Sequence, residues 1–302
     1  MGTVFQPSLN FWAGSGIGIS LQGHSLPSSA LNHSSLLLYV HGYNNDEAEA
    51  SVSYNEFQTL QNRLGGLSAN IVGILWPGAS WSGELFYMKA ISQAEKVGAK
   101  LAKQLHTQAK SSGYLKLDIV AHSLGNRLML ETIKALINLL KTDPAPIFFG
   151  QMALMAAAVP VRYLEANKQL NAAINAFSSS LNLYSNSDNV LHFAFPAGQS
   201  AAGQGFFPVA LGRKQWLGAQ FSVPSMRQVE NVGYGHGDYW GGRSDEVDIN
   251  KHAAKKVRDF MPHIGKLPQR VIDAPVSLSR NPISRSQTKA RIISSRSIPT
   301  RI

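Results

Sequence analysis

The pattern that most constrains this chain is an alternation of short apolar segments with longer segments of helical spacing, which begins near residue 36. The apolar segments lie at 36–42, 69–78, 115–123, 151–160, 181–188 and 227–235, and the helical ones at 47–66, 83–110, 125–141, 161–177 and 246–261. Apolar strands separated by helices are typical of a parallel sheet covered on both faces. The sequence therefore predicts an α/β fold with a doubly wound, mostly parallel sheet, helices on both faces and right-handed crossovers.

The predicted sheet domain covers residues 35–264, with an N-terminal extension at 1–34 and a basic tail at 265–302. The tail holds eight Lys or Arg residues and one acid, Asp273, so it supplies most of the chain's net charge of +10. Its Ser, Pro and Arg residues follow no period, which favours disorder. The tail can be a solvated extension or a weak electrostatic tether to an anionic membrane or a partner protein. It has no aromatic residue, so we expect no specific nucleic-acid partner.

Targeting and cofactor signals are absent from the sequence. No apolar run reaches the roughly 18 residues of a membrane span, and the first residues lack the basic and apolar regions of a signal peptide. We therefore expect a cytoplasmic protein, with non-classical secretion left open. The chain has no cysteine, which removes disulfide and thiolate chemistry. The glycine-rich stretch Gly14–Gly18 leads into no Lys-Ser or Lys-Thr pair and no helix, so we expect no nucleotide, metal or other cofactor.

Residues that can carry chemistry follow several of the predicted strands, where ligands bind in open α/β sheets. The first strand ends in His41-Gly42-Tyr43, and glycine there lets the backbone turn sharply. The second ends between Trp76 and Trp81, which can line a substrate pocket or simply pack. Asp188 follows a later strand, where an aspartate is most often a turn residue.

Ser123 lies between a predicted strand and a predicted helix in the stretch Ala-His-Ser-Leu-Gly. A nucleophilic serine on a strained strand-to-helix turn needs small residues two positions before and after it. Ala121 and Gly125 occupy those positions, and Ala121 departs from the usual glycine by one methyl group. The alternative is a serine that merely caps the N-terminus of the following helix.

A nucleophilic serine also needs a histidine as base and a carboxylate that orients it. Among the nine histidines, only His236 lies in a loop between the last predicted strand and the last helix, and glycines flank it. Ser123, Asp188 and His236 thus follow one another in the order serine, acid, histidine at predicted strand ends. Asp238 and Asp245 are weaker candidates for the acid.

The motifs at residues 40–45, 76–77, 121–127, 184–188 and 235–236 together resemble the α/β-hydrolase superfamily, in particular a bacterial branch of serine hydrolases whose substrates are largely unassigned. The resemblance spans about residues 35–262 and implies a fold with a small cap or none. It also implies that Ser123 is the nucleophile, His236 the base and Asp188 the acid, with the amides of Tyr43 and Leu124 as oxyanion hole. One departure strengthens Asp188: residues 157–160 lack the aspartate that relatives often carry after the preceding strand.

The implied activity is the cleavage of a carboxylic ester, with acyl and lipid esters as expected classes, by a carboxylesterase or lipase-like enzyme that forms an acyl-enzyme. The Gly-, Ala- and Phe-rich stretch at 194–207 can form a small lid or a pocket wall. Two alternatives stay open: a binding or effector protein that keeps the fold without turnover, and an acyltransferase that uses the same three residues.

Overall fold

The computed structural model describes residues 8–11, 34–43, 45–66, 70–78, 84–216, 223–243 and 245–262. Within these residues, seven strands form one sheet in the order β1-β3-β2-β4-β5-β6-β7, and every neighbouring pair is parallel. The strands are β1 (Ser8–Asn10), β2 (Ser35–Val40), β3 (Asn70–Leu75), β4 (Leu115–His122), β5 (Ile147–Met155), β6 (Ser179–Tyr184) and β7 (Met226–Glu230). The predicted basic tail and Trp81 lie outside the described residues.

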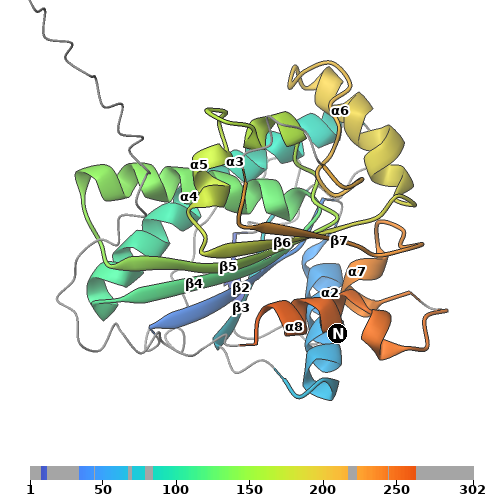
Figure 1. The fold of residues 1–302 in the computed structure, drawn as a ribbon. Coiled ribbons are helices and arrows are strands. Elements are labelled where there is room, and N and C mark those ends of the chain that lie inside the picture. Colours follow the sequence, from blue (N-terminus) through green and yellow to red (C-terminus); the bar gives the residue numbers. More distant parts are fainter. Residues whose placement is uncertain are drawn as a thin grey trace, which may run out of the picture.

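Helices cover both faces of the sheet, with α3, α4, α5 and α6 on one face and α2, α7 and α8 on the other (Figure 1). The α-helices are α2 (Glu47–Arg63), α3 (Glu84–Ser112), α4 (Leu124–Thr142), α5 (Asn171–Asn175), α6 (Phe195–Ala201), α7 (Asp238–Gly241) and α8 (Ala253–Phe260). Short 3₁₀ turns lie at Val161–Leu164 and Ile249–Lys251, and a π-helical turn, η2, at Val190–Ala194. This arrangement confirms the predicted doubly wound α/β fold.

The central strands are apolar because they are buried from both sides. Every residue of β2 and β4 is buried, as expected for strands between two helical layers. On one face, α3 and α4 approach closely at Gly98, where an added Cβ would lie 3.1 Å from the amide nitrogen of Thr132. The sheet therefore holds the carboxyl ends of β2, β4 and β6 in fixed positions at one edge.

Asp118 is a buried charge within β4, and its contacts explain why it belongs to the fold. Its Oδ2 lies 3.0 Å from Lys116 Nζ, and its Oδ1 accepts a 2.7 Å hydrogen bond from the amide of Gln151. The register between β4 and β5 shifts at this point. The carboxylate thus compensates an irregularity of the sheet far from the carboxyl ends of the strands.

Three segments differ from their prediction. The helix expected at 161–177 is broken, because Asn167 takes a left-handed conformation with φ 63° that asparagine tolerates and a helix cannot contain. The last helix begins only at Ala253, because His252 is extended. No helix is predicted for the Gly-, Ala- and Phe-rich stretch at 194–207, yet it contains α6.

The sheet also gains an edge strand from the predicted N-terminal extension. Residues 8–10 form β1, which pairs with β3, and the side chain of Phe11 is fully buried in the core. Three residues with mixed polarity gave no periodic signal in the sequence.

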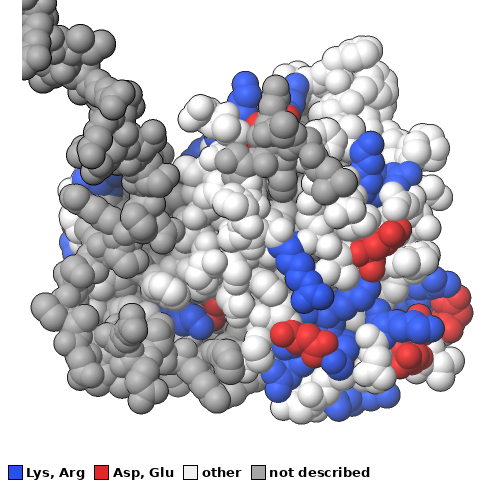
Figure 2. All heavy atoms as spheres, in the orientation of Figure 1, with Lys and Arg blue, Asp and Glu red and all other residues white. Residues whose placement is uncertain are grey.

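Basic and acidic side chains mingle on the face formed by β7 and α8, whereas the lobe around α6 carries little charge (Figure 2). None of the helices in the described ranges is both long and apolar enough to cross a membrane.

Candidate active site

Ser123 forms the turn between β4 and α4 in a strained backbone conformation, with φ 51° and ψ −125°. A non-glycine residue rarely adopts a positive φ, and such strain persists only where the surroundings fix it. The side chain of Ser123 makes no capping hydrogen bond to α4. The helix-cap alternative for this serine is therefore not what the structure contains.

Two close contacts hold the strained turn in place. Gly125 packs so tightly on the carbonyl groups of Val40 and His41 that an added Cβ would overlap them. Asn126 donates two hydrogen bonds of 3.1 Å from its side-chain amide, one to the carbonyl of Ser123 and one to that of Met155. Asn126 was not predicted as a site residue, since an asparagine in the first turn of a helix has no sequence signal beyond its position.

His236 lies in the loop after β7, and its ring joins the residues predicted from the sequence. Its Nε2 lies 2.7 Å from Ser123 Oγ, and its Nδ1 lies 2.8 Å from Asp188 Oδ2. Because a carboxylate can only accept, Nδ1 carries the hydrogen, and Nε2 is left to accept from the serine hydroxyl. The structure thus brings together Ser123, His236 and Asp188 in one hydrogen-bonded chain.

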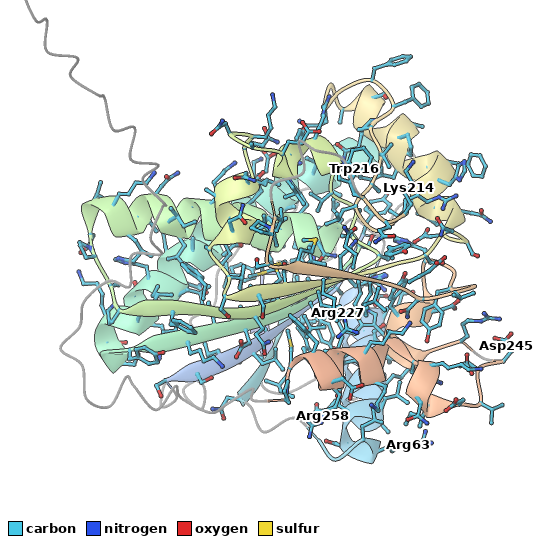
Figure 3. The ribbon with its side chains drawn as sticks, in the orientation of Figure 1. Arg63, Lys214, Trp216, Arg227, Asp245 and Arg258 are labelled. Carbon is cyan, nitrogen blue, oxygen red and sulfur yellow. The ribbon has the colours of Figure 1, made fainter. Side chains whose placement is uncertain are left out.

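The carboxylate of Asp188 is fully buried, and both of its oxygens have partners. Oδ2 faces His236, and Oδ1 accepts a 2.9 Å hydrogen bond from the amide of Leu191. The two rival acids lie elsewhere. Asp238 accepts a 2.7 Å hydrogen bond from the amide of Gly235, and Asp245 pairs with Arg243 and points away from the body (Figure 3).

The loop after β2 comes directly against Ser123. An added Cβ on Gly42 would lie 2.6 Å from Ser123 Cβ and 3.2 Å from Ser123 Oγ. On its other side, Gly42 faces Gly78, where an added Cβ would lie 2.7 Å from the Gly42 carbonyl oxygen. Glycine is therefore required here for space, and the backbone of Gly42 and Tyr43 passes next to the serine.

A buried network around His41 fixes this loop. The His41 amide donates to the Tyr54 hydroxyl at 2.7 Å, and Tyr54 donates in turn to the carbonyl of Ile74 at 2.7 Å. The indole of Trp76 stacks on the His41 ring and donates a 2.9 Å hydrogen bond to its carbonyl. The structure thus places Trp76, a candidate for the substrate pocket, inside the core as a support of the loop.

His122, beside the serine, is buried and supports the loop that carries His236. Its Nε2–H donates a 2.8 Å hydrogen bond to the main-chain carbonyl of His236. Burial, and then the nearby His236, lower the pKa of His122 to about 3. Burial likewise lowers the pKa of His41 to about 4. Both histidines are therefore neutral at physiological pH and add no positive charge beside His236.

The arrangement can deprotonate a serine hydroxyl and stabilise the imidazolium that results. Among the described residues, no cluster of histidine and acidic side chains has the form of a metal site. The parallel sheet, its helices and the strained turn after β4 define an α/β-hydrolase fold.

The sequence matches the family described as "Alpha/beta hydrolase of unknown function (DUF900)" over residues 24–235, well over half of its length. The chain belongs to this family. The matched region includes Ser123 and Asp188 and ends one residue before His236. No curated protein matches the sequence significantly.

Solved structures with a similar arrangement include esterase 2 of Thermogutta terrifontis with bound propionate, at 12% identity and a TM-score of 0.40 over 82% of this chain and 87% of that one. TT1662 from Thermus thermophilus is 12% identical, with a TM-score of 0.41 over 78% and 91% of the two chains. Est1E from Butyrivibrio proteoclasticus is 11% identical, with a TM-score of 0.36 over 76% and 88%.

The lowered pKa of His122 predicts a pH dependence of stability. The unfolded chain binds a proton on this residue below about pH 6.5, whereas the folded chain does not until about pH 3. This contribution to stability is therefore complete above pH 6.5 and is lost as the pH falls toward 3. For His122→Asn, the fall in the free energy of unfolding between pH 7 and pH 5 should be about 2 kcal/mol smaller than for the wild type, measured by urea denaturation.

Val247→Asn is the matched control, because Val247 is 96% exposed and neither side chain titrates. Its change in stability between the two pH values should follow that of the wild type. An identical pH dependence in His122→Asn and the wild type would contradict the assignment of a neutral, buried His122.

Proposed function

We propose that this protein is a serine hydrolase that cleaves a carboxylic ester through an acyl-enzyme. The observation that carries the proposal is the chain of hydrogen bonds from Asp188 through His236 to Ser123, at 2.8 and 2.7 Å, on a strained turn at the carboxyl end of β4. Membership of an α/β-hydrolase family agrees with it. Ser123 is the nucleophile, His236 the general base and acid, and Asp188 the residue that orients His236.

In the first half of the proposed reaction, Ser123 Oγ attacks the ester carbonyl while His236 Nε2 takes the hydroxyl proton. Asp188 stabilises the imidazolium through its contact with Nδ1. The tetrahedral intermediate collapses when the bond to the alcohol oxygen breaks, and His236 returns the proton to that oxygen. The alcohol leaves, and the acyl group stays on Ser123.

In the second half, a water molecule takes the place of the alcohol. His236 removes its proton as it attacks the acyl carbon, and the same proton then returns to Ser123 Oγ when the carboxylic acid leaves. The base needs free access to this water, and the side chain of His236 is 18% exposed, in contrast to the fully buried Asp188.

The negative charge that develops on the carbonyl oxygen needs donors that are already in place. We assign this role to the main-chain amides of Leu124 and Tyr43. Leu124 is the first residue of α4, where amides have no partner within the helix and the helix dipole favours an anion. Tyr43 directly follows Gly42, whose backbone lies against the side chain of Ser123.

The first test is covalent labelling with a fluorophosphonate, which reacts with an activated serine. The wild type should label, Ser123→Ala should not, and His236→Ala should label more slowly by about a thousandfold or more, because the hydroxyl loses its base. Gel fluorescence over time measures the rate. The matched control is Ser187→Ala, because Ser187 is an exposed serine that follows a strand of the same sheet, β6. This variant should label like the wild type. A wild type that fails to label, or a Ser123→Ala that labels, would sink the proposal.

The second test separates the candidates for the acid. Asp188→Asn should lower the turnover of p-nitrophenyl acetate by about ten-thousandfold, because an amide favours the wrong tautomer of His236. Asp238→Asn is the matched control and should keep turnover within about tenfold, since Asp238 contacts the amide of Gly235 and not the histidine. The reverse order of the two effects would move the acid role away from Asp188.

The third test concerns the space between Gly42 and Ser123. In Gly42→Ala, the new methyl group would lie 2.6 Å from Ser123 Cβ, so the turn or the loop must shift. A misplacement of this size should lower turnover of the same ester by about a hundredfold or more. Gly113→Ala also strains the backbone, at φ 71°, but it has no atom within 4 Å of the new methyl group and lies at the other end of β4, so the turnover of the folded variant should stay near that of the wild type. Normal turnover in a folded Gly42→Ala would exclude a close oxyanion loop.

A further inference from the structure

The segment from Val190 to Val209, which we call the aromatic segment, exposes an unusual amount of apolar surface. Phe206 is 89% exposed, Phe193 67% and Phe207 57%. The segment begins with the exposed Val190 and ends with the exposed Val209. These are five of the eight large hydrophobic side chains that are exposed among the described residues. A large exposed apolar surface on a protein commonly marks an interaction site.

The turn that carries Phe206 and Phe207 is held in shape by Ser200. The Ser200 hydroxyl donates to the carbonyl of Gly205 at 3.1 Å and accepts from the amide of Phe207 at 2.7 Å. Phe207 has a positive φ of 38°, a strained conformation for an aromatic residue. The two rings meet edge to face with centroids 4.9 Å apart. The strained turn holds both rings in solvent. Burial of the rings within the chain therefore does not compensate for the strain.

The aromatic segment is fastened to the body on both sides of this turn. Two of its own side chains, Leu191 and Phe195, are buried in the core. Gln204 accepts a 2.5 Å hydrogen bond from the Tyr163 hydroxyl on its Oε1. After the segment, the amide of Leu211 donates a 2.9 Å hydrogen bond to the carbonyl of Val159. The exposed rings therefore project from an anchored base.

The stretch of sequence that contains the aromatic segment carries basic but no acidic side chains. The sequence contains no Asp or Glu from residue 189 to residue 229. The guanidinium of Arg162 packs against Gly205 at the base of the turn, and Arg213 and the exposed Lys214 follow the segment (Figure 3). Figure 2 shows the lobe around α6 without acidic side chains and with basic ones beside its base.

We infer that the aromatic segment docks on an anionic lipid bilayer, with Phe193, Phe206 and Phe207 in the boundary between head groups and acyl chains. Projecting aromatic rings with cations behind them fit a surface that is apolar inside and negatively charged outside. The basic tail, with its eight Lys or Arg residues, adds attraction of the same sign. The helix α6, which precedes Phe206 and Phe207 in the chain, lies on an outward lobe of the molecule (Figure 1). A bilayer accepts projecting rings without preformed cavities, whereas a protein partner would need a matching cavity for each ring.

The segment is also directly continuous with the candidate active site. The carboxylate of Asp188, which holds His236, accepts its second hydrogen bond from Leu191 in the first turn of the segment. Docking would therefore hold the site beside the lipid surface. The docking itself needs no turnover, so it stands or falls separately from the proposed ester hydrolysis.

The experiment is cosedimentation of the full chain with vesicles. The wild type should bind vesicles of mixed phosphatidylserine and phosphatidylcholine more tightly than vesicles of phosphatidylcholine alone. The double substitution Phe206→Ser with Phe207→Ser should weaken binding to the anionic vesicles by about tenfold to a hundredfold, because two apolar side chains no longer leave water. The tail stays in place, so the change isolates the aromatic segment.

Val247→Ser is the matched control, because Val247 is 96% exposed and lies outside the aromatic segment. It should bind the anionic vesicles like the wild type, and so should Ser123→Ala, which removes any turnover. Thermal unfolding shows whether the double variant is folded, and Phe193→Ser alone gives a second, smaller perturbation. No binding by the wild type, or equal binding by a folded double variant, would overturn the inference. A wild-type dimer that the double substitution converts to monomers would also overturn it, because the rings would then meet a second copy.

Discussion

The strained backbone at Ser123 is the constraint on which the site depends. Its positive φ places the hydroxyl at the end of β4 beside His236, and neighbouring backbone groups enforce this conformation. The Ser123 amide donates to the carbonyl of Met155 at 2.9 Å, and the Ser123 carbonyl accepts from Asn126 and from the amide of Ala158. The carboxyl ends of β4 and β5, with the residues that follow them, thus position one side chain. This explains why the turn sits at the centre of the sheet, where neighbouring strands can hold it from both sides.

Space at this turn is as tightly set as hydrogen bonding. Gly125 lets α4 touch the end of β2, and Gly42 lets the loop after β2 touch Ser123. The missing methyl group at Gly125 permits contact with the carbonyl oxygens of Val40 and His41, and the one at Gly42 permits contact with the side chain of Ser123. In the proposed mechanism, the amides of Tyr43 in this loop and Leu124 at the start of α4 bind the oxyanion, and donors that are already oriented need no rearrangement as charge develops.

The histidines near the turn differ in their burial and charge. Of the residues whose rings surround the serine, His41 and His122 are buried and neutral, whereas His236 is partly exposed and faces a buried carboxylate. A positive charge on His122, 5.1 Å from His236 between ring centroids, would disfavour protonation of His236. A neutral His122 therefore does not oppose the protonation of His236 that the proposed mechanism requires.

The sequence predicted the parts of this protein that periodic patterns encode. The alternation of strands and helices predicted the parallel sheet and its two helical layers. Small residues two positions from Ser123 and glycines on both sides of His236 indicated two of the residues that meet at the edge of the sheet. The roles of Asn126, His122 and Trp76 could not be predicted, because they rest on contacts between residues 29 to 114 positions apart. Likewise, Asn167 breaks a helical pattern through a single backbone angle that neighbouring residues do not reveal.

The aromatic segment begins at the turn that completes the candidate active site. A buried carboxylate needs hydrogen bonds to both of its oxygens, or its charge is costly to bury. Asp188 takes one from His236 and one from Leu191, so the turn that completes the acid also starts the segment that exposes the phenylalanines. The orientation of His236 and the direction of the exposed rings therefore share one piece of backbone. In the docking that we infer, the π-helical turn that carries Phe193 also supplies the amide that binds Asp188, so contact with a surface would reach the acid through residues 190–194.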